Sequence, residues 1–303
     1  MTLTDAPLIS VIIPTYNHAR YLGRALQSVL DQTFSNWEII IVDNHSTDNT
    51  DELVASFADS RTTYLKVHNH GVIAKSRNMG VRAAKGEWIA FLDSDDWWSA
   101  DKLKVWFDCV SDKVDLVYHD LEIVNAQPRS WSRKKNRSGQ VQPPVLTHLL
   151  LGGNVISNSS VVVRKSLLEK IGGIDESAEM IAAEDYNAWL RIAQLTDRFV
   201  YLPHRLGYYF VHSQGISKRD MAVPARRAVA EFMPMLSALQ TLKVEANFAY
   251  TTGHFNYFAG NYPEARADLY LAVKQGFLMT KVKSAILLCM LVFKQTFVAN
   301  GKS

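Results

Sequence analysis

Short runs of β-branched and other apolar residues alternate with segments of helical periodicity over the first hundred positions of the chain. Such alternation is typical of βα units, which build a mainly parallel sheet with helices on its faces. The runs are almost continuously apolar, as expected of strands that are covered on both faces. The sequence therefore predicts an α/β fold with four early strands, at 8–15, 37–44, 62–68 and 88–95.

The segment after the first predicted strand favours an amphipathic helix. Its apolar residues recur at helical spacing and would share one face: Leu22, Ala25, Leu26, Val29 and Leu30. Asn17 precedes this face, and asparagine is a favoured N-cap residue because its side chain can accept a bond from a free backbone N–H. We therefore expect Asn17 to cap the helix.

The alternation continues after residue 96 and gives way to a purely helical pattern near residue 217. The expected elements are a helix near 100–110, a strand near 114–124, a polar loop at 126–144, a strand near 158–164, a helix near 183–195 and a strand near 198–202. Residues 253–275 predict a helical hairpin that turns at Gly260, Asn261 and Pro263. The chain is thus expected to hold an α/β domain at 1–216 and a helical region at 217–303.

Composition and charge exclude several other classes of protein. A net charge of +3 is too small to indicate nucleic-acid binding, so no nucleic-acid partner is expected. The two cysteines, Cys109 and Cys289, form neither a disulfide framework nor a zinc motif, which favours a reducing cytoplasm. No secretory signal is visible, and the apolar run at 285–293 is too short to span a bilayer. A cytoplasmic location is the expectation.

Polar residues gather where the predicted parallel strands end, and ligands of open parallel sheets bind at those ends. They are Thr15, Tyr16 and Asn17 after the first strand, Asp43 and Asn44 after the second, and Asp93, Ser94, Asp95 and Asp96 after the fourth. The glycine-rich turn of a dinucleotide site and the Gly-Lys-Ser/Thr of a nucleoside triphosphatase are both absent. A phosphate-bearing ligand would therefore be held by something other than glycines.

Asp93 and Asp95 can supply that alternative through a divalent cation. Residues two apart in an extended segment point the same way, so both carboxylates can face one ion. Mg²⁺ and Mn²⁺ take such oxygen ligands and complete their shell with phosphate oxygens. A solvated turn or a helix cap is the other interpretation, and the buried type of strand at 88–92 argues against it.

Several motifs together resemble the family 2 glycosyltransferases of the GT-A fold. They are Ser10-Val11-Ile12-Ile13-Pro14-Thr15-Tyr16-Asn17, Ser28-Val29-Leu30-Asp31-Gln32-Thr33, Val42-Asp43-Asn44-His45-Ser46-Thr47-Asp48, Arg77-Asn78-Met79-Gly80, Gly86-Glu87-Trp88-Ile89-Ala90-Phe91-Leu92-Asp93-Ser94-Asp95-Asp96 and Glu184-Asp185-Tyr186. The resemblance covers about the first 215 residues and leaves the last part of the chain unmatched. It implies an inverting enzyme that moves a sugar from a nucleoside diphosphate to an acceptor hydroxyl, with Mn²⁺ or Mg²⁺ as cofactor.

The resemblance also implies roles on the donor side. Thr15, Tyr16 and Asn17 would line the base pocket, with Ser94 among the donor-binding residues. Asp43 or Asn44 would pair with the pyrimidine edge, and Arg77 would lie nearby. Asp95 would be the main metal ligand, Asp93 a ribose or metal partner, and His212 a residue facing the metal or the diphosphate.

On the acceptor side, the resemblance implies that Asp185 is the general base. Sugar transfer with inversion needs such a base, because a hydroxyl is a poor nucleophile until its proton is removed. Glu184 and Asp185 could instead cap a helix, and Glu184 is a weaker candidate for acceptor contact. Trp97 and Trp98 could form a wall for a sugar ring or simply lie in the core.

Two residues depart from the family's pattern. Asn44 stands where a second Asp is frequent, so uracil and thymine donors both remain open, with UDP-sugars favoured. Phe210 stands where an Arg is common, so a phosphate contact would come from elsewhere, such as Lys218 or Arg219.

The resemblance points to cell-surface polysaccharide or lipopolysaccharide assembly, with a glycan or lipid-linked glycan as acceptor. The basic stretch 129–137 is compatible with peripheral contact to an anionic membrane, although a solvated loop is the favoured interpretation. A catalytically silent scaffold protein and a nucleotidyltransferase are the competing functions. The carboxylate set argues against the first, and the lack of a glycine after Pro14 argues against the second. Oligomeric state is left open.

Overall fold

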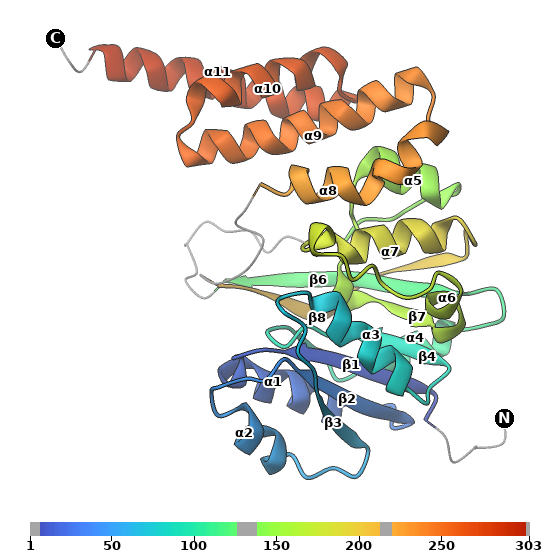
Figure 1. Cartoon of the computed structure of the whole chain (residues 1–303). Coiled ribbons are helices and arrows are strands. Elements are labelled where there is room, and N and C mark those ends of the chain that lie inside the picture. Colours follow the sequence, from blue (N-terminus) through green and yellow to red (C-terminus); the bar gives the residue numbers. More distant parts are fainter. Residues whose placement is uncertain (1–6, 126–137, 213–219, 301–303) are drawn as a thin grey trace. The chain divides into compact units, whose positions relative to one another are not determined.

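The computed structural model describes residues 7–125, 138–212 and 220–300, and side chains in the last helix as far as Phe293 (Figure 1). The chain divides into two compact units. The first comprises 1–146 and 154–214, and the second comprises 147–153 and 215–303. The sequence placed the boundary at residue 216 but assigned no element to 145–152, which forms helix α5 (Val145–Gly152) and lies mostly in the second unit.

The first unit is built on a mixed sheet in the order β3-β2-β1-β4-β7-β6-β8-β5. Its strands are β1 (Ile9–Thr15), β2 (Trp37–Asp43), β3 (Thr62–Lys66), β4 (Trp88–Phe91), β5 (Trp97–Trp98), β6 (Leu116–Asn125), β7 (Val162–Arg164) and β8 (Phe199–Val211). The neighbours β1 to β4 run parallel, as do β6 and β8, whereas β7 is antiparallel to both of its neighbours and β5 is antiparallel to β8. The predicted mainly parallel sheet is confirmed, with these antiparallel exceptions.

Helices cover both faces of this sheet. They are α1 (Ala19–Leu30), α2 (Thr50–Ser56), α3 (Ile73–Ala83), α4 (Lys102–Cys109), α6 (Lys165–Lys170) and α7 (Glu184–Ala193). Alternate residues of β1 serve opposite faces. Val11 and Ile13 belong to the core cluster that α1 and α4 complete, whereas Ile12 faces α3, where Gly80 allows close approach.

Two local predictions for the first unit are corrected by the structure. Asn17 does not cap α1: His18 occupies the N-cap position, and Asn17 adopts a left-handed conformation with φ of 50°. The first N–H of the helix, on Ala19, instead donates to the carboxylate of Asp48 at 3.0 Å. Strand β8 runs nine residues past its predicted end at 202, because it pairs with β6 across a register shift.

The second unit is helical, as predicted. Besides α5 it contains α8 (Ala222–Val229), α9 (Ala238–Ala259), α10 (Tyr262–Gln275) and α11 (Leu278–Asn300). The hairpin predicted at 253–275 is confirmed as the α9–α10 pair, and its turn uses Gly260 in the left-handed conformation. A small core packs between α9, α10 and α11 around Tyr257, Leu269 and Leu287. Among the described residues, each helix is too short or too polar to cross a membrane.

Candidate active site

The carboxyl ends of β1, β2 and β4 lie side by side, because these three strands are parallel neighbours in the sheet. Thr15 pairs with Asp43 in the β1–β2 register, and both side chains are buried. Tyr16 is 52% exposed at the same edge, so it presents its ring to solvent. The polar residues that the sequence placed at separate strand ends are thus brought to one edge.

Asp43 organises the loop that follows β2. Its buried carboxylate accepts bonds from the N–H and the hydroxyl of Ser46 and from the Tyr64 hydroxyl, the last at 3.0 Å. Burial is the largest cause that raises the pKa of the Tyr64 hydroxyl, and hydrogen bonding to Asp51 and the charge of Asp43 raise it further. The hydroxyl therefore stays protonated and acts as a donor. Asp43 therefore holds the wall of the expected base pocket, and these bonds occupy much of its capacity to accept from a base.

Asn17 and Asn44 fix the same loop. The Asn17 side-chain oxygen accepts from the Thr47 N–H at 2.8 Å, and the Asn17 N–H donates to the Ser46 hydroxyl. The Asn44 side-chain oxygen accepts from the Asn69 N–H at 2.8 Å. This bond fixes the orientation of the Asn44 amide, so its NH₂ end is the part left to contact a ligand.

Arg77 on α3 is buried and links two parts of the site. Its guanidinium donates to Asp93 at 2.8 Å and to Glu184, at the start of α7, at 2.6 Å. Burial alone would lower the pKa of Arg77, but these two carboxylates hold that pKa above its ordinary value. Arg77 therefore forms an ion-pair bridge between the loop after β4 and α7, and its predicted place near the pyrimidine edge stays a prediction.

Asp95 and His212 are brought together, although 117 positions separate them in the chain. The Nε2 atom of His212 lies 2.8 Å from a carboxylate oxygen of Asp95, and the histidine is buried directly after β8. Ser94 points elsewhere, since its buried hydroxyl lies 2.9 Å from Nδ1 of His18. The structure thus brings together two of the three residues that the sequence predicted as metal ligands, and that role stays a prediction.

Asp95 and His212 suit a divalent cation that takes its further ligands from a bound diphosphate and from water. Within the described residues, His, Cys, Asp and Glu side chains form no cluster of three or more that could hold a metal alone. One oxygen of Asp93 already accepts from Arg77 and from Asn158, and its role as a ribose or metal partner stays a prediction. The remaining two ligands, one oxygen and one nitrogen, suit an ion that completes its shell with diphosphate oxygens and water.

Asp185 and Glu184 open α7, and the structure gives them different surroundings. Glu184 is buried and ion-paired with Arg77. Asp185 is partly exposed and accepts from the N–H of Tyr186, while the Asn154 amide approaches its two oxygens at 3.4 and 3.5 Å. Burial and the neighbouring charge of Glu184 raise the pKa of Asp185 to about 7. Of the two residues, Asp185 is the one suited to take up a proton near neutral pH.

Trp97 and Trp98, which the sequence offered as a wall for a sugar ring or as core residues, have different surroundings. Trp98 is 3% exposed, donates from its indole N–H to the Ser159 carbonyl at 2.8 Å, and lies beneath the ammonium of Lys102. It is a core residue and has no free face for a sugar. Trp97 is partly exposed and stacks on Tyr208, with the Arg24 guanidinium 3.5 Å from the centre of its ring.

Two residues of this region were missed by the sequence interpretation, His18 and Arg24, and a third, Asp96, was placed at the strand end but given no role. Arg24 on α1 donates to the Asp95 carbonyl at 3.1 Å and also lies over the ring of Phe210. Asp96 is buried and accepts from the Phe210 N–H, and burial followed by the charges of Asp95 and Asp93 raises its pKa well above the ordinary value. A weak signal for Arg24 existed, since it is a charged residue one turn into the helix that follows β1. Lys218, Arg219 and the basic stretch 129–137 lie outside the described residues.

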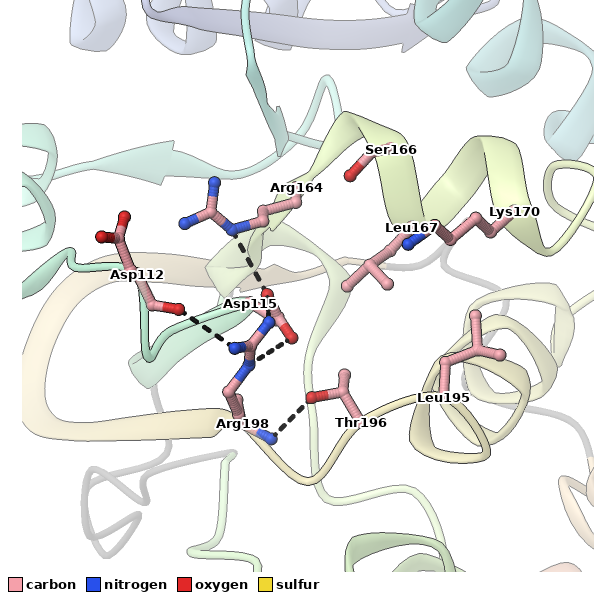
Figure 2. A pocket seen from close by; sticks show the side chains of 9 residues that line it. All are labelled: Asp112, Asp115, Arg164, Ser166, Leu167, Lys170, Leu195, Thr196 and Arg198. Carbon is pink, nitrogen blue, oxygen red and sulfur yellow. Dashed lines mark hydrogen bonds and ion pairs between the residues drawn. The ribbon is translucent and has the colours of Figure 1, made fainter.

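A cavity of about 510 Å³ lies at the opposite edge of the sheet, near the end of β7 and the starts of β6 and β8 (Figure 2). Its two arginines, Arg164 and Arg198, both pair with the buried carboxylate of Asp115. Their other donors bond to Glu87 and to the backbone carbonyls of Val114, Ser111 and Asp112. The cavity is therefore lined by a structural ion cluster and does not compete with the polar edge as a donor site.

Comparisons with known proteins agree with this geometry. A family model described as "Glycosyl transferase family 2" matches residues 10–172. The UDP-Glc:alpha-D-GlcNAc-diphosphoundecaprenol beta-1,3-glucosyltransferase WfgD of Escherichia coli is 34% identical over 191 residues, which cover 62% of this chain and 70% of that protein. The putative colanic acid biosynthesis glycosyl transferase WcaA of E. coli K12 is 31% identical over 195 residues, covering 63% and 67%.

Solved structures share the fold at lower sequence identity. A complex of Staphylococcus aureus TarS 1-349 with UDP-GlcNAc superposes with a TM-score of 0.64 at 20% identity, covering 88% of this chain and 81% of that one. The mannosyltransferase PcManGT of Pyrobaculum calidifontis, in complex with GDP-Man and Mn²⁺, gives 0.63 at 21% identity, covering 96% and 82%. With the family model matching more than half of its length, the chain belongs to glycosyl transferase family 2 and has the GT-A fold.

Proposed function

We propose that this protein is an inverting glycosyltransferase that moves a sugar from a UDP-sugar, or from a dTDP-sugar, to a hydroxyl of a lipid-linked glycan. The observation that carries the proposal is the bridge from Asp93 through Arg77 to Glu184, which brings α7 and its Asp185 to the edge where β1, β2 and β4 end. The substrates in the name of WfgD and the UDP-GlcNAc bound to TarS support a uridine donor. Assembly of a cell-surface polysaccharide, at a membrane that carries the acceptor, is the setting that these relatives support.

Asp185 would act as the base in a single displacement. The acceptor oxygen forms a bond to the sugar's anomeric carbon while the bond from that carbon to the diphosphate breaks. The proton of the acceptor hydroxyl passes to a carboxylate oxygen of Asp185, so that no covalent intermediate with the protein is needed. Attack from the face opposite the leaving group inverts the anomeric centre.

Asp95 and His212 would hold a divalent cation against the leaving diphosphate. Bound there, the ion supplies positive charge where negative charge develops. A carboxylate paired with an imidazole favours Mn²⁺ over the harder Mg²⁺, which prefers oxygen ligands alone.

Arg24 would provide a further positive charge on this side of the site. It is exposed, lies against Trp97 and Phe210, and donates to the backbone of Asp95. Phe210 itself offers no charge, so Arg24 is the described cation best placed to meet a phosphate group beside Asp95.

Calorimetric titration of UDP with and without Mn²⁺ tests the metal and donor sites. The unmodified protein should bind UDP about tenfold or more tightly with Mn²⁺, equivalent to about 1.4 kcal/mol. Asp95→Ala should lose this metal dependence. Asp108→Ala, which removes an exposed carboxylate on α4 that pairs with Lys104, should behave as the unmodified protein. An unchanged Mn²⁺ effect in Asp95→Ala would remove Asp95 as the ligand.

The two competing functions predict different outcomes. A silent scaffold would bind UDP without transferring sugar to any acceptor. A nucleotidyltransferase would release pyrophosphate from UTP and a sugar 1-phosphate. Transfer from a UDP-sugar without pyrophosphate release would distinguish the proposed enzyme from both.

A further inference from the structure

Helix α11 (red in Figure 1) carries an apolar stripe that the second unit does not cover. Its members follow one another at helical spacing and are between 44% and 66% exposed: Met279, Val282, Ile286, Met290 and Phe293. The face toward the core is a different one, formed by the buried Ser284, Leu287 and Leu291. The helix thus has an apolar face for its own unit and a second one turned to solvent. Exposing that much apolar side chain in a row is unfavourable unless something binds there.

Positive charge accompanies this stripe. Residues 269–303 contain five lysines and no acidic residue, whereas the 268 residues before them contain 28 basic and 30 acidic residues. The small net charge of the chain therefore conceals a strongly basic end. Lys283 is exposed and lies one turn from both Met279 and Ile286, at the margin of the stripe.

We propose that the exposed face of α11 binds an anionic lipid surface. An apolar stripe with Lys283 at its margin, on a helix whose charged residues are all lysines and whose described part is not long and apolar enough to span a bilayer, is the pattern of a helix that lies in the membrane interface. Its apolar side chains would enter the acyl boundary, and its lysines would meet lipid phosphates. A second copy of the chain is the less suitable occupant, because pairing two α11 faces would bring lysines together with no acidic residue on this helix to neutralise them.

This inference uses only the surface of the second unit, so it does not depend on the proposed function. If both hold, binding to the membrane would raise the local concentration of a lipid-linked acceptor. The donor site and the transfer step would remain as described without it.

Co-sedimentation of the full chain with lipid vesicles tests the proposal. The protein should pellet with vesicles containing about one-third phosphatidylglycerol and far less with pure phosphatidylcholine, and added salt should weaken the binding. Ile286→Glu should lower the partition coefficient about tenfold or more, because a charge would enter the middle of the apolar face. Replacing Lys281 and Lys283 by Gln should lower it about fivefold for each lysine.

Leu195→Glu is the matched control. Leu195 is 51% exposed against 55% for Ile286, and it lies in the first unit. It should bind vesicles as the unmodified chain does. Ile286→Ser removes the apolar side chain without adding a charge. Circular dichroism on every variant shows whether a loss of vesicle binding accompanies a loss of folding.

Three outcomes would overturn the proposal: equal partition of Ile286→Glu and the unmodified chain, equal binding to neutral and anionic vesicles, or no vesicle binding at all. A dimer in sedimentation velocity that Ile286→Glu dissociates, without vesicle binding, would assign the face to a second copy instead. Transfer to a water-soluble acceptor should be the same in Ile286→Glu, so a failed proposal here is distinguishable from a failed enzyme assignment.

Discussion

Asp185 and Glu184 are neighbours in the chain, and the sequence alone could not separate a base from a helix cap. Their contacts separate them. Glu184 is buried and its charge is balanced by Arg77, whereas the nearest side-chain amide, that of Asn154, reaches Asp185 only at 3.4 Å. Through the family resemblance the sequence predicted Asp95 as a metal ligand and His212 as a residue facing the metal or the diphosphate, and the structure brings these two side chains into contact. The sequence could not find Arg24 or His18, because their roles depend on which loops fold over α1.

We predict that transfer depends on pH through Asp185. The pKa of its carboxyl is raised from 3.8 to about 7, so the basic form required for catalysis is lost as pH falls through 7. The rate constant kcat should therefore decline below neutrality. Asp185→Asn should lower kcat about 10²- to 10⁴-fold and leave UDP affinity unchanged. Asp175→Asn, which changes a partly exposed carboxylate nearby in the chain, is the control. A rate that stays constant down to pH 5 would contradict this assignment.

The strands that could be predicted are those whose apolar run is sufficient to identify them without knowledge of their partners. Strands β1, β2 and β4 were found because they are buried on both faces. The antiparallel direction of β7 and the two-residue strand β5 were not, because each is defined by a distant partner. Likewise β8 continues past a register shift, where its pairing with β6 resumes at Arg205 and no apolar pattern marks the strand.

We predict opposite effects for two glycine substitutions. A Cβ at Gly86, before β4, would lie 2.7 Å from the backbone nitrogen of Ser10, so backbone must move. Gly86→Ala should lower the free energy of unfolding by about 1–3 kcal/mol. Gly23, inside α1, has its nearest neighbour in the flexible side chain of Leu53 at 3.5 Å. Gly23→Ala should raise that free energy by about 0.5–1 kcal/mol, because alanine has less chain entropy to lose. Urea titration measures both, and destabilisation of equal size would contradict the packing described for β1 and β4.

At the scale of the whole molecule, the sequence predicted two regions, 1–216 and 217–303, and the structure divides into two compact units. The sequence missed α5, because a single short helix of eight residues gives little periodic signal. That helix matters, since residues 147–153 belong to the second unit although they interrupt the first in sequence. Which distant segments join one unit is decided by tertiary contacts that local patterns do not record.

Calorimetric unfolding should show two transitions, one for each unit. UDP with Mn²⁺ should raise the midpoint of one transition only, because a ligand stabilises the unit that binds it. Gly86→Ala should lower the midpoint of that same transition, since Gly86 lies in the first unit. A single transition that both changes displace together would mean that the units unfold as one.

The position of Arg77 limits how this protein can change. One buried cation balances the charge of Asp93, in the loop after β4, and that of Glu184, next to Asp185, so both sides of the site share a single positive charge. Substituting Arg77 would leave Asp93 and Glu184 without their shared positive charge. The surroundings of the donor and of the acceptor would then change together. New sugar or acceptor preferences are therefore expected to arise at surrounding positions such as Asn44 and Trp97, while this arginine stays fixed.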